Sequence, residues 1–465
     1  MNVNWKIKQK IKKILQNEQG MQITAPGSRS GFALVYPNTY RVGMSNLGLH
    51  VIYGQINRRD DTACERAFFP DRADVPLYTA TNTPIMTIET QRPLAAFPLI
   101  GFILSFEMDY INALKILTWG KIPLRSDARA ETDPLVIAGG PCATFNPEPV
   151  ADYFDALVIG EGEEVIHTLI DTVYACRNKR LNRRDTLLAL ANIEGVYVPR
   201  FYHPVYAADG TLEKISHDPG VPSIVRRRWI RDLDQYRAAT EVVTKNTEFS
   251  GMFLIEISRG CGRHCRFCMA GYCFRNPRVR SLAALRPMLE RAASYGLKAG
   301  LVGAAVSDHP EIDRICAAIA ELGIGISVSS LRADSVSEQL LAALAASGHK
   351  TVTFAPEAGS EAARAVINKG ISDEDIYRAV KSAVRAGIPN VRLYFMVGLP
   401  YQEAKKEAAS IIALARNIKS VMQEAQIKSQ PKGKLTLSIN TFVPKPFTPF
   451  QWTAMSPLAA AAETL

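Results

Sequence analysis

Short apolar segments alternate with helical segments along most of this chain, and that alternation limits the possible folds more than any other feature. From residue 252 onward, Ala-rich and Leu-rich stretches separate successive apolar segments. Alternation of this kind is typical of a parallel sheet whose strands are joined by crossover helices. We therefore predict six strands in this part of the chain, at 252–257, 300–303, 325–329, 351–355, 391–397 and 435–442.

Six strand-helix units within about 190 residues are too few for a complete eightfold barrel. The expectation for residues 247–455 is a (βα)6 partial TIM barrel. Chemistry in such folds takes place on the loops that follow the strands, at their carboxyl ends.

The amino-terminal half shows the same alternation with shorter segments. Residues 31–165 are expected to form a flavodoxin-like or Rossmann-like parallel sheet domain, so the fold class is α/β. Its predicted strands are 32–36, 100–106, 135–138 and 156–159. Three further segments complete the expected organisation: a basic amino-terminal helix in 1–30, a connector over 166–246 and a tail over 456–465.

Composition indicates the cellular location of the protein. The longest apolar runs fall short of the roughly 18 residues that a membrane span requires, and the basic start lacks the apolar core of a signal peptide. We therefore expect a cytoplasmic protein with no membrane partner. The net charge of +10 is compatible with an RNA partner and equally with simple solubility.

Three of the eight cysteines stand close together, directly after the first strand of the predicted barrel. Cys261, Cys265 and Cys268 have the spacing C-x3-C-x2-C, which lets one loop supply three thiolates to an iron–sulfur cluster and leaves one iron open. A structural zinc site is the alternative, with His264 or Cys273 as its fourth ligand. The position at a strand end favours a [4Fe–4S] cluster.

With Phe267 just before the last cysteine, this loop resembles the cluster loop of the radical S-adenosylmethionine (SAM) superfamily. The resemblance implies that a one-electron donor, such as a flavodoxin or a ferredoxin, drives reductive cleavage of SAM. Cleavage would give methionine and a 5′-deoxyadenosyl radical that abstracts hydrogen from a substrate. The motifs identify neither that substrate nor a catalytic residue acting on it.

The resemblance also implies that residues at the strand ends bind SAM. One departure is the stretch Gly303-Ala304-Ala305, which stands where the family often has Gly-Gly-Glu for the methionine amino group. Arg332 and Glu357 are the preferred polar candidates. The full set of expected cofactor-binding residues is Phe267, Gly303, Ala304, Ser330, Arg332, Glu357, Ser360, Gly398 and Leu399.

The amino-terminal half resembles the cobalamin-binding-like domain that precedes many barrels of this superfamily. The likeness lies in Gly139-Gly140-Pro141 and in the acidic, Gly-rich stretch 160–163. Together with the sequence of residues 36–48, this likeness indicates an uncharacterised branch of the superfamily. The Asp-x-His-x-x-Gly signature that supplies a histidine to cobalt is absent, and His50 falls in the first expected helix of the 31–165 domain. Some members bind cobalamin without a histidine ligand, so cobalamin stays among the expected cofactors.

Three functions are compatible with these observations. The first is a cobalamin-dependent radical SAM enzyme such as a methyltransferase. The second is a methylthiotransferase-like enzyme modifying RNA or a ribosomal protein, a family with three cluster-binding cysteines in its first domain, where this chain has Cys64, Cys142 and Cys176. The third is a zinc-stabilised RNA-binding protein.

Overall fold

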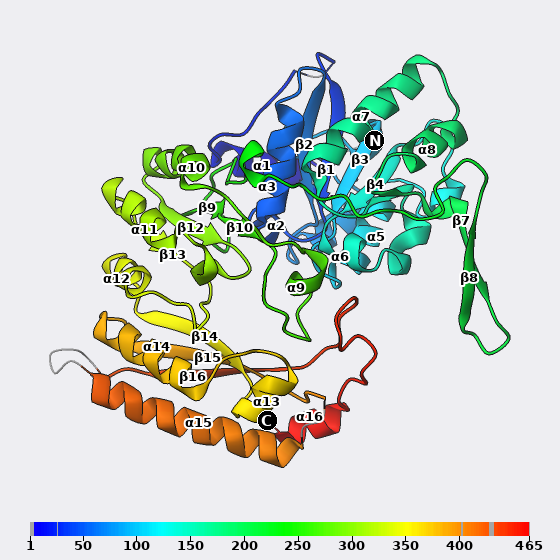
Figure 1. Cartoon of the computed structure of the whole chain (residues 1–465). Helices are drawn as coiled ribbons and strands as arrows, with labels where there is room; N and C mark the ends of the chain where they lie inside the picture. The colour runs from blue at the N-terminus through cyan, green and yellow to red at the C-terminus, as the bar shows by residue number, and fades with distance from the viewer. Residues whose placement is uncertain (1–3, 26, 401–402, 427–431, 465) are drawn as a thin grey trace. The chain divides into compact units, whose positions relative to one another are not determined.

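The computed structural model describes residues 4–464, apart from 26, 401–402 and 427–431. The chain divides into two compact units, coloured blue to green and green to red in Figure 1. The first unit comprises Met1–Arg231 and Tyr236–Ser250, and the second comprises Asp232–Gln235 and Gly251–Leu465. Residues 166–246, expected as a connector, contribute mostly to the first unit.

The first unit is built on a six-stranded sheet with the order β2-β1-β3-β4-β5-β6. Strands β1 to β5 are parallel, whereas β6 runs antiparallel to β5. The order 2-1-3-4-5 is that of flavodoxin-like sheets, in which the chain reverses its direction of winding between β1 and β3. The strands are β1 (Ser30–Tyr36), β2 (Thr62–Phe68), β3 (Leu99–Ile103), β4 (Leu135–Gly139), β5 (Ala156–Val158) and β6 (Val196–Tyr197).

Helices cover both faces of this sheet. Alternate residues of β1 point to opposite sides, so that Phe32 and Leu34 join one buried apolar cluster and Ala33 and Val35 join another. The first cluster also takes residues from α1, α3, α7 and α8, and the second from α5. The helices of the unit are α1 (Trp5–Gln16), α2 (Tyr40–Gly43), α3 (Leu47–Asn57), α4 (Val75–Thr81), α5 (Asp109–Trp119), α6 (Pro141–Phe145), α7 (Gly162–Asn178) and α8 (Arg183–Ala191), with a hairpin of β7 (Tyr202–Tyr206) and β8 (Leu212–His217).

Strand β2 was not expected from the sequence. Its seven residues are all buried although they include Glu65 and Arg66. The Arg66 guanidinium lies between the carboxylates of Glu18, at 2.6 Å, and Glu89, at 2.7 Å, with all three side chains at most 1% exposed. Two charged residues therefore interrupt the apolar pattern, and their partners lie on segments distant in sequence.

The second unit contains six parallel strands in chain order. Strands β9, β12 and β13 form one sheet and β14, β15 and β16 form another. A parallel bridge between Leu331 and Phe354 joins the two sheets, so the six strands form a continuous series, as the predicted (βα)6 partial barrel requires. The strands are β9 (Met252–Glu256), β12 (Lys298–Val302), β13 (Ile326–Ser327), β14 (Thr351–Glu357), β15 (Asn390–Val397) and β16 (Leu435–Thr441).

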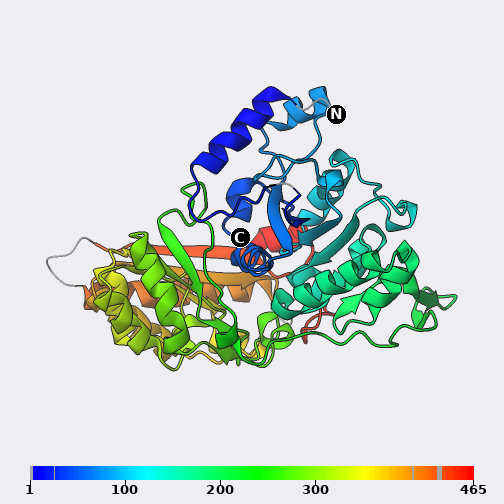
Figure 2. The ribbon, with the colours of Figure 1, turned by 90° about the horizontal axis from the view of Figure 1, so that it is seen from above.

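At least one helix follows each of these six strands (Figures 1 and 2). A short antiparallel pair, β10 (Ser258–Arg259) with β11 (Arg278–Val279), follows β9 and precedes the first long helix. The helices of the unit are α9 (Ala270–Cys273), α10 (Leu282–Ser294), α11 (Ile312–Glu321), α12 (Glu338–Ala346), α13 (Glu361–Val366), α14 (Asp373–Arg385), α15 (Ala404–Ala425) and α16 (Leu458–Thr464).

Candidate functional site

The three cysteines of the C-x3-C-x2-C motif lie in the loop that β10 and β11 close. Cys265 is buried, whereas Cys261 and Cys268 are partly exposed, and all three are free thiols. The backbone N–H of Cys268 donates to the carbonyl of Cys265 at 3.1 Å, which keeps these two residues in one tight turn. The backbone N–H of Arg263 donates to Cys261 Sγ at 3.4 Å.

Two glycines allow this loop to fold back on itself. Gly260 has φ of +80°, and a Cβ at this position would lie 1.9 Å from the carbonyl oxygen of Phe274. A Cβ at Gly271 would lie 2.4 Å from the carbonyl oxygen of Arg263. No other residue fits either position without moving the backbone.

The three thiols lie close enough together for their charges to interact. Burial raises the pKa of Cys265, and the nearby charges of Lys369 and Arg332 oppose that shift. Burial also raises the pKa of Cys268, which the Cys265 and Cys261 thiols raise further. Among the described residues, no group of three or more His, Cys, Asp or Glu side chains converges on the position of a single metal ion.

The chemistry and placement of these donors fit an iron–sulfur cluster. Each thiolate binds a different iron of such a cluster, so the sulfurs need to share one loop but need not meet at one point. Of the two residues considered as a fourth zinc ligand, His264 is exposed, with its Nε2 3.1 Å from Arg275 Nη2, and Cys273 is buried in α9.

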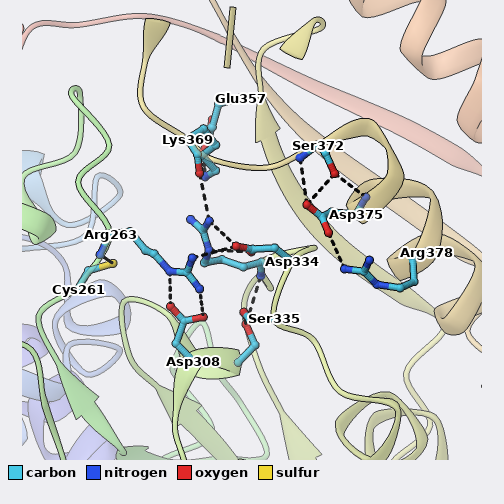
Figure 3. Close-up of polar contacts among 12 residues, drawn as sticks. Cys261, Arg263, Asp308, Asp334, Ser335, Glu357, Lys369, Ser372, Asp375 and Arg378 are labelled. Atoms are coloured by element: carbon cyan, nitrogen blue, oxygen red, sulfur yellow. Dashed lines mark hydrogen bonds and ion pairs between the residues drawn. The ribbon is translucent and has the colours of Figure 1, made fainter. Parts of the chain in front are cut away.

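A network of ion pairs connects the cysteine loop to the ends of β12 and β13 (Figure 3). Arg263 donates to both carboxylate oxygens of Asp308, at 2.9 and 3.1 Å, and to Asp334 Oδ2 at 3.0 Å. Arg332 donates to both oxygens of Asp334, each at 3.0 Å. The network holds the loop against two strand ends of the same unit.

A second charged pair follows β14. Glu357 is the last residue of that strand, and its carboxylate lies 3.4 Å from the ammonium of Lys369. The Lys369 ammonium lies 5.9 Å from the centre of the Phe267 ring, which is within range of a cation–π interaction. This pair therefore lies next to the residue that precedes Cys268.

The structure gives different surroundings to the other residues expected to bind a cofactor. Gly303 leaves no room for a side chain, since a Cβ there would lie 2.5 Å from Ser258 Oγ, and Ala304 is exposed. Ser330 is partly buried. Ser360 caps α13 by accepting from the backbone N–H of Ala363 at 3.2 Å.

The two candidates after β15 serve the structure of the unit itself. Gly398 has φ of +74°, and its backbone N–H donates to Glu407 Oε2 at 3.1 Å. Leu399 is 3% exposed and packs in an apolar cluster with Phe442, against which Phe267 also packs. Their role in binding SAM remains a prediction.

Sequence reasoning missed Lys369, Asp308 and Asp334 as members of the site. Asp308 and Asp334 lie near strand ends, so their position was a usable signal. Lys369 lies in the loop between α13 and α14, away from any strand end, and the sequence contains no comparable signal for it.

The other cysteines do not form a second cluster of thiols in the described part of the chain. Cys64, Cys142 and Cys176 are buried on β2, α6 and α7 respectively. Cys64 and Cys142 belong to the two apolar clusters on opposite faces of the first unit's sheet, so these residues do not form a methylthiotransferase-like arrangement of three cysteines.

A parallel (βα)6 series with three cysteines in the loop after its first strand is the arrangement of a radical SAM enzyme. The family described as "Radical SAM proteins, N-terminal" matches residues 48–199, and the "Radical SAM superfamily" matches residues 255–410. This chain belongs to the radical SAM superfamily, and it is an enzyme. Membership implies a [4Fe–4S] cluster and SAM as cofactors.

Three curated relatives are similar to parts of the chain that range from 35% to 90% of its length. An uncharacterized protein of Methanocaldococcus jannaschii is 29% identical over 90% of this chain and 78% of its own length. An uncharacterized methyltransferase of Pyrococcus horikoshii is 26% identical over 61% of this chain and 58% of its own. The bacteriochlorophyllide d C-8(2)-methyltransferase of Chlorobaculum tepidum is 29% identical over 35% of this chain and 28% of its own.

Two solved structures share the fold. The radical SAM methyltransferase TsrM of Kitasatospora setae aligns with a TM-score of 0.58 and 15% identity, over 90% of this chain and 75% of that one. The cobalamin-dependent radical SAM enzyme OxsB aligns with a TM-score of 0.54 and 15% identity, over 83% of this chain and 52% of that one. Among the described residues, the structure contains no helix with the length and apolar character of a membrane span.

Proposed function

We propose that this chain is a cobalamin-dependent methyltransferase of the radical SAM superfamily. The observation that carries the proposal is the presence, in one chain, of a flavodoxin-like parallel sheet and a radical SAM (βα)6 unit. TsrM and OxsB share the fold over 90% and 83% of the chain, and two curated relatives are named as methyltransferases.

In this proposal Cys261, Cys265 and Cys268 hold the [4Fe–4S] cluster. Bound there and reduced, the cluster would supply the electron for SAM cleavage to methionine and a 5′-deoxyadenosyl radical. Arg263 fixes the loop through Asp308, and its backbone N–H donates to Cys261 Sγ, a contact that stabilises negative charge on that sulfur. A flavodoxin-type or ferredoxin-type protein is the proposed electron donor.

The carboxyl edge of the first unit's sheet is the proposed cobalamin site. Open parallel sheets bind ligands where the winding reverses, which is between β1 and β3 in this strand order. Asn38, after β1, donates to the carboxylate of Asp109 at 2.8 Å, and Ser105, after β3, accepts from Asn46 at 3.1 Å. Phe106, which follows Ser105, is 55% exposed and offers an apolar contact at the same edge.

His50, on α3, has other contacts within the first unit. His50 is 3% exposed, and its Nε2 lies 3.1 Å from the carbonyl oxygen of Met44. Its Nδ1 accepts from the backbone N–H groups of Glu241 and Val242 at 3.3 and 3.4 Å. Both ring nitrogens are thus engaged inside the unit, so we propose that cobalamin binds without a ligand from His50.

Cobalamin retention tests this proposal. The purified chain, reconstituted with iron and sulfide, is incubated with hydroxocobalamin, desalted and analysed for iron and cobalt. We expect the wild type to retain cobalt and Phe106→Asp to retain less cobalt per chain. Ile224→Asp, at a 68% exposed residue of the same unit, should retain as much cobalt as the wild type. If the cluster-loaded chain retains no cobalt, the proposed dependence on cobalamin is wrong. The protein would then be a radical SAM enzyme that does not use cobalamin.

A further inference from the structure

Helix α1 of the first unit carries five lysines and no acidic residue. Its apolar side is held by the protein, because Ile7 and Ile11 are buried in one apolar cluster of the unit and Ile14 and Leu15 pack against that cluster. The opposite side of the helix faces outward at the surface of the first unit, where Figure 2 shows α1 in dark blue. The helix is therefore an ordered element that presents one fixed side to a partner.

The outward side of α1 combines an aromatic ring with several cations. With about 3.6 residues per turn, Trp5, Lys12 and Gln16 lie along the middle of this side. Lys6 and Lys13, two turns apart, lie beside them. Trp5 is 69% exposed, and the other four residues are exposed as well. We call these five residues the basic face; at a rise of about 1.5 Å per residue it is about 16 Å long.

Most of the lysines do not stabilise the helix that carries them. Lys6 lies in the first turn, where the helix dipole favours an acidic residue, and that turn contains none. Lys10 repels Lys6, which lies four residues before it, and Lys12 repels Lys8 in the same way. Lys13, in the last turn, is the exception, since the dipole favours a cation there. The helix therefore holds more positive charge than its own stability requires.

In the part of the chain that the structure describes, acidic side chains pair with Lys10 and with no other lysine of α1. Lys10 pairs with Asp71, at 2.9 Å, and with Asp74. Arg72 lies between these two aspartates in the sequence and is exposed, so it adds a cation to the same region. The lysines of the basic face therefore keep their charge for a partner outside the unit.

The chemistry of the basic face fits a single-stranded nucleic acid. Ammonium groups bind phosphates, and an exposed indole ring stacks on an unpaired base. The Gln16 amide could bond to a sugar hydroxyl, the group that distinguishes RNA from DNA. A membrane fits less well, because an interfacial helix inserts its apolar side into the bilayer, whereas Ile7 and Ile11 are already buried in the protein.

We propose that the basic face of α1 binds single-stranded RNA. Lys6, Lys12 and Lys13 contact the phosphates, and Trp5 stacks on a base. The surface belongs to the first unit and involves neither the cysteine loop nor the proposed cobalamin site. The inference therefore goes beyond the proposed methyl transfer and does not depend on it.

Fluorescence anisotropy of a labelled, unstructured RNA of about 12 nucleotides tests the proposal on the reconstituted full-length chain at a series of salt concentrations. The aromatic variant is Trp5→Ala. The charge variant combines Lys6→Gln, Lys12→Gln and Lys13→Gln. A control with the same net charge combines changes at three exposed lysines of α14 and α15: Lys381→Gln, Lys405→Gln and Lys419→Gln.

We expect the charge variant to bind RNA more weakly and with less dependence on salt. The slope of log affinity against log salt concentration should become shallower by about 2, since each phosphate contact to a single strand contributes about 0.7. Trp5→Ala should weaken binding by about 5- to 100-fold, the range for loss of one stacked base, and leave the slope unchanged. The far-ultraviolet spectrum and urea unfolding establish that each variant is folded.

Three results would overturn the proposal. The first is a wild-type chain that does not bind the RNA, or that binds single-stranded DNA of the same sequence more tightly. The second is an equal change of slope in the charge variant and the control, which would reflect net charge alone. The third is Trp5-dependent binding to vesicles of equimolar phosphatidylcholine and phosphatidylserine without binding to RNA. None of these results bears on the proposed function, which the iron and cobalt contents test.

Discussion

Arg263 donates to both carboxylate oxygens of Asp308, from Nε to Oδ2 at 2.9 Å and from Nη2 to Oδ1 at 3.1 Å. Arg263 lies two residues after Cys261, and Asp308 ends the short helical turn η6 (Val306–Asp308) that follows β12. The bidentate geometry fixes both the distance and the orientation of the two groups. The first cysteine of the motif is therefore anchored to the end of the second barrel strand.

Replacing Asp308 with Asn should loosen the cysteine loop. The variant loses a bidentate ion pair, but the Arg263 side chain is 38% exposed, so the expected loss of unfolding free energy is only about 1 kcal/mol. Iron should leave the reconstituted variant faster than the wild type when a chelator is added. Glu374→Gln is the control, and equal iron loss from Asp308→Asn and from the wild type would contradict this role.

Glycine at position 260 should be indispensable for cluster loading. Gly260→Ala places a Cβ 1.9 Å from the carbonyl oxygen of Phe274 at a φ of +80°, so the loop must change its path. Gly262→Ala is a close control, since its Cβ would lie 3.6 Å from Pro277 Cγ, an ordinary contact. We expect iron per chain to fall sharply in Gly260→Ala and to stay near the wild-type value in Gly262→Ala. Equal loading of the two variants would show that the loop tolerates a different path.

The buried ion pair at the end of β9 should give stability that depends on pH. Burial raises the pKa of Glu256, but Arg259 and Arg280 outweigh it, so the pKa is lower than the usual 4.5. A carboxyl whose pKa is lower in the folded state contributes stability above its unfolded pKa and loses it as the pH falls through the folded value.

Glu256→Gln should therefore lower the unfolding free energy by about 3 kcal/mol at neutral pH, because Arg280 stays buried. The difference from the wild type should be constant above about pH 5 and shrink below the usual Glu pKa. Urea unfolding at a series of pH values measures it. A difference that grows on acidification would contradict the sign.

In the first unit, Arg66 should be essential for stability. Replacing it with Met leaves the Glu18 and Glu89 carboxylates buried without their cation, which should cost about 3–5 kcal/mol. Arg58→Met is the comparison, because Arg58 is 41% exposed in its pair with Glu241, and this change should cost about 1 kcal/mol or less. Urea unfolding of the two variants gives both values, and similar values would contradict the argument.

Much of the fold followed from apolar periodicity alone. The six barrel strands and four strands of the first unit were predicted close to their observed positions, because each is a short apolar run flanked by turn residues. Strand β2 was missed because Glu65 and Arg66 interrupt its apolar pattern. The pairing of Arg66 with Glu18 and Glu89 depends on the tertiary structure and leaves no periodic signal.

The site was predictable where it follows strand ends and unpredictable elsewhere. Glu357 and Arg332 were predicted to bind the cofactor because each follows a predicted strand. The sequence could not show that Arg332 is engaged by Asp334 or that Lys369, 12 residues after Glu357, lies beside it. The position of Lys369 arises from the path of α13 and of the loop that follows it, whereas Arg332 and Asp334 pair within the loop after β13.

The most direct test of the account is the metal content and spectrum of the anaerobically reconstituted chain, beside Cys265→Ala and the control Cys316→Ala, whose thiol is buried on α11. We predict about four irons per chain in the wild type and in Cys316→Ala, as one [4Fe–4S] cluster requires, and a reduced paramagnetic signal that changes when SAM is added. Cys265→Ala should lose both. A wild-type protein that holds zinc and no iron, with no response to SAM, would contradict the assignment of the cysteine loop as a radical SAM cluster site.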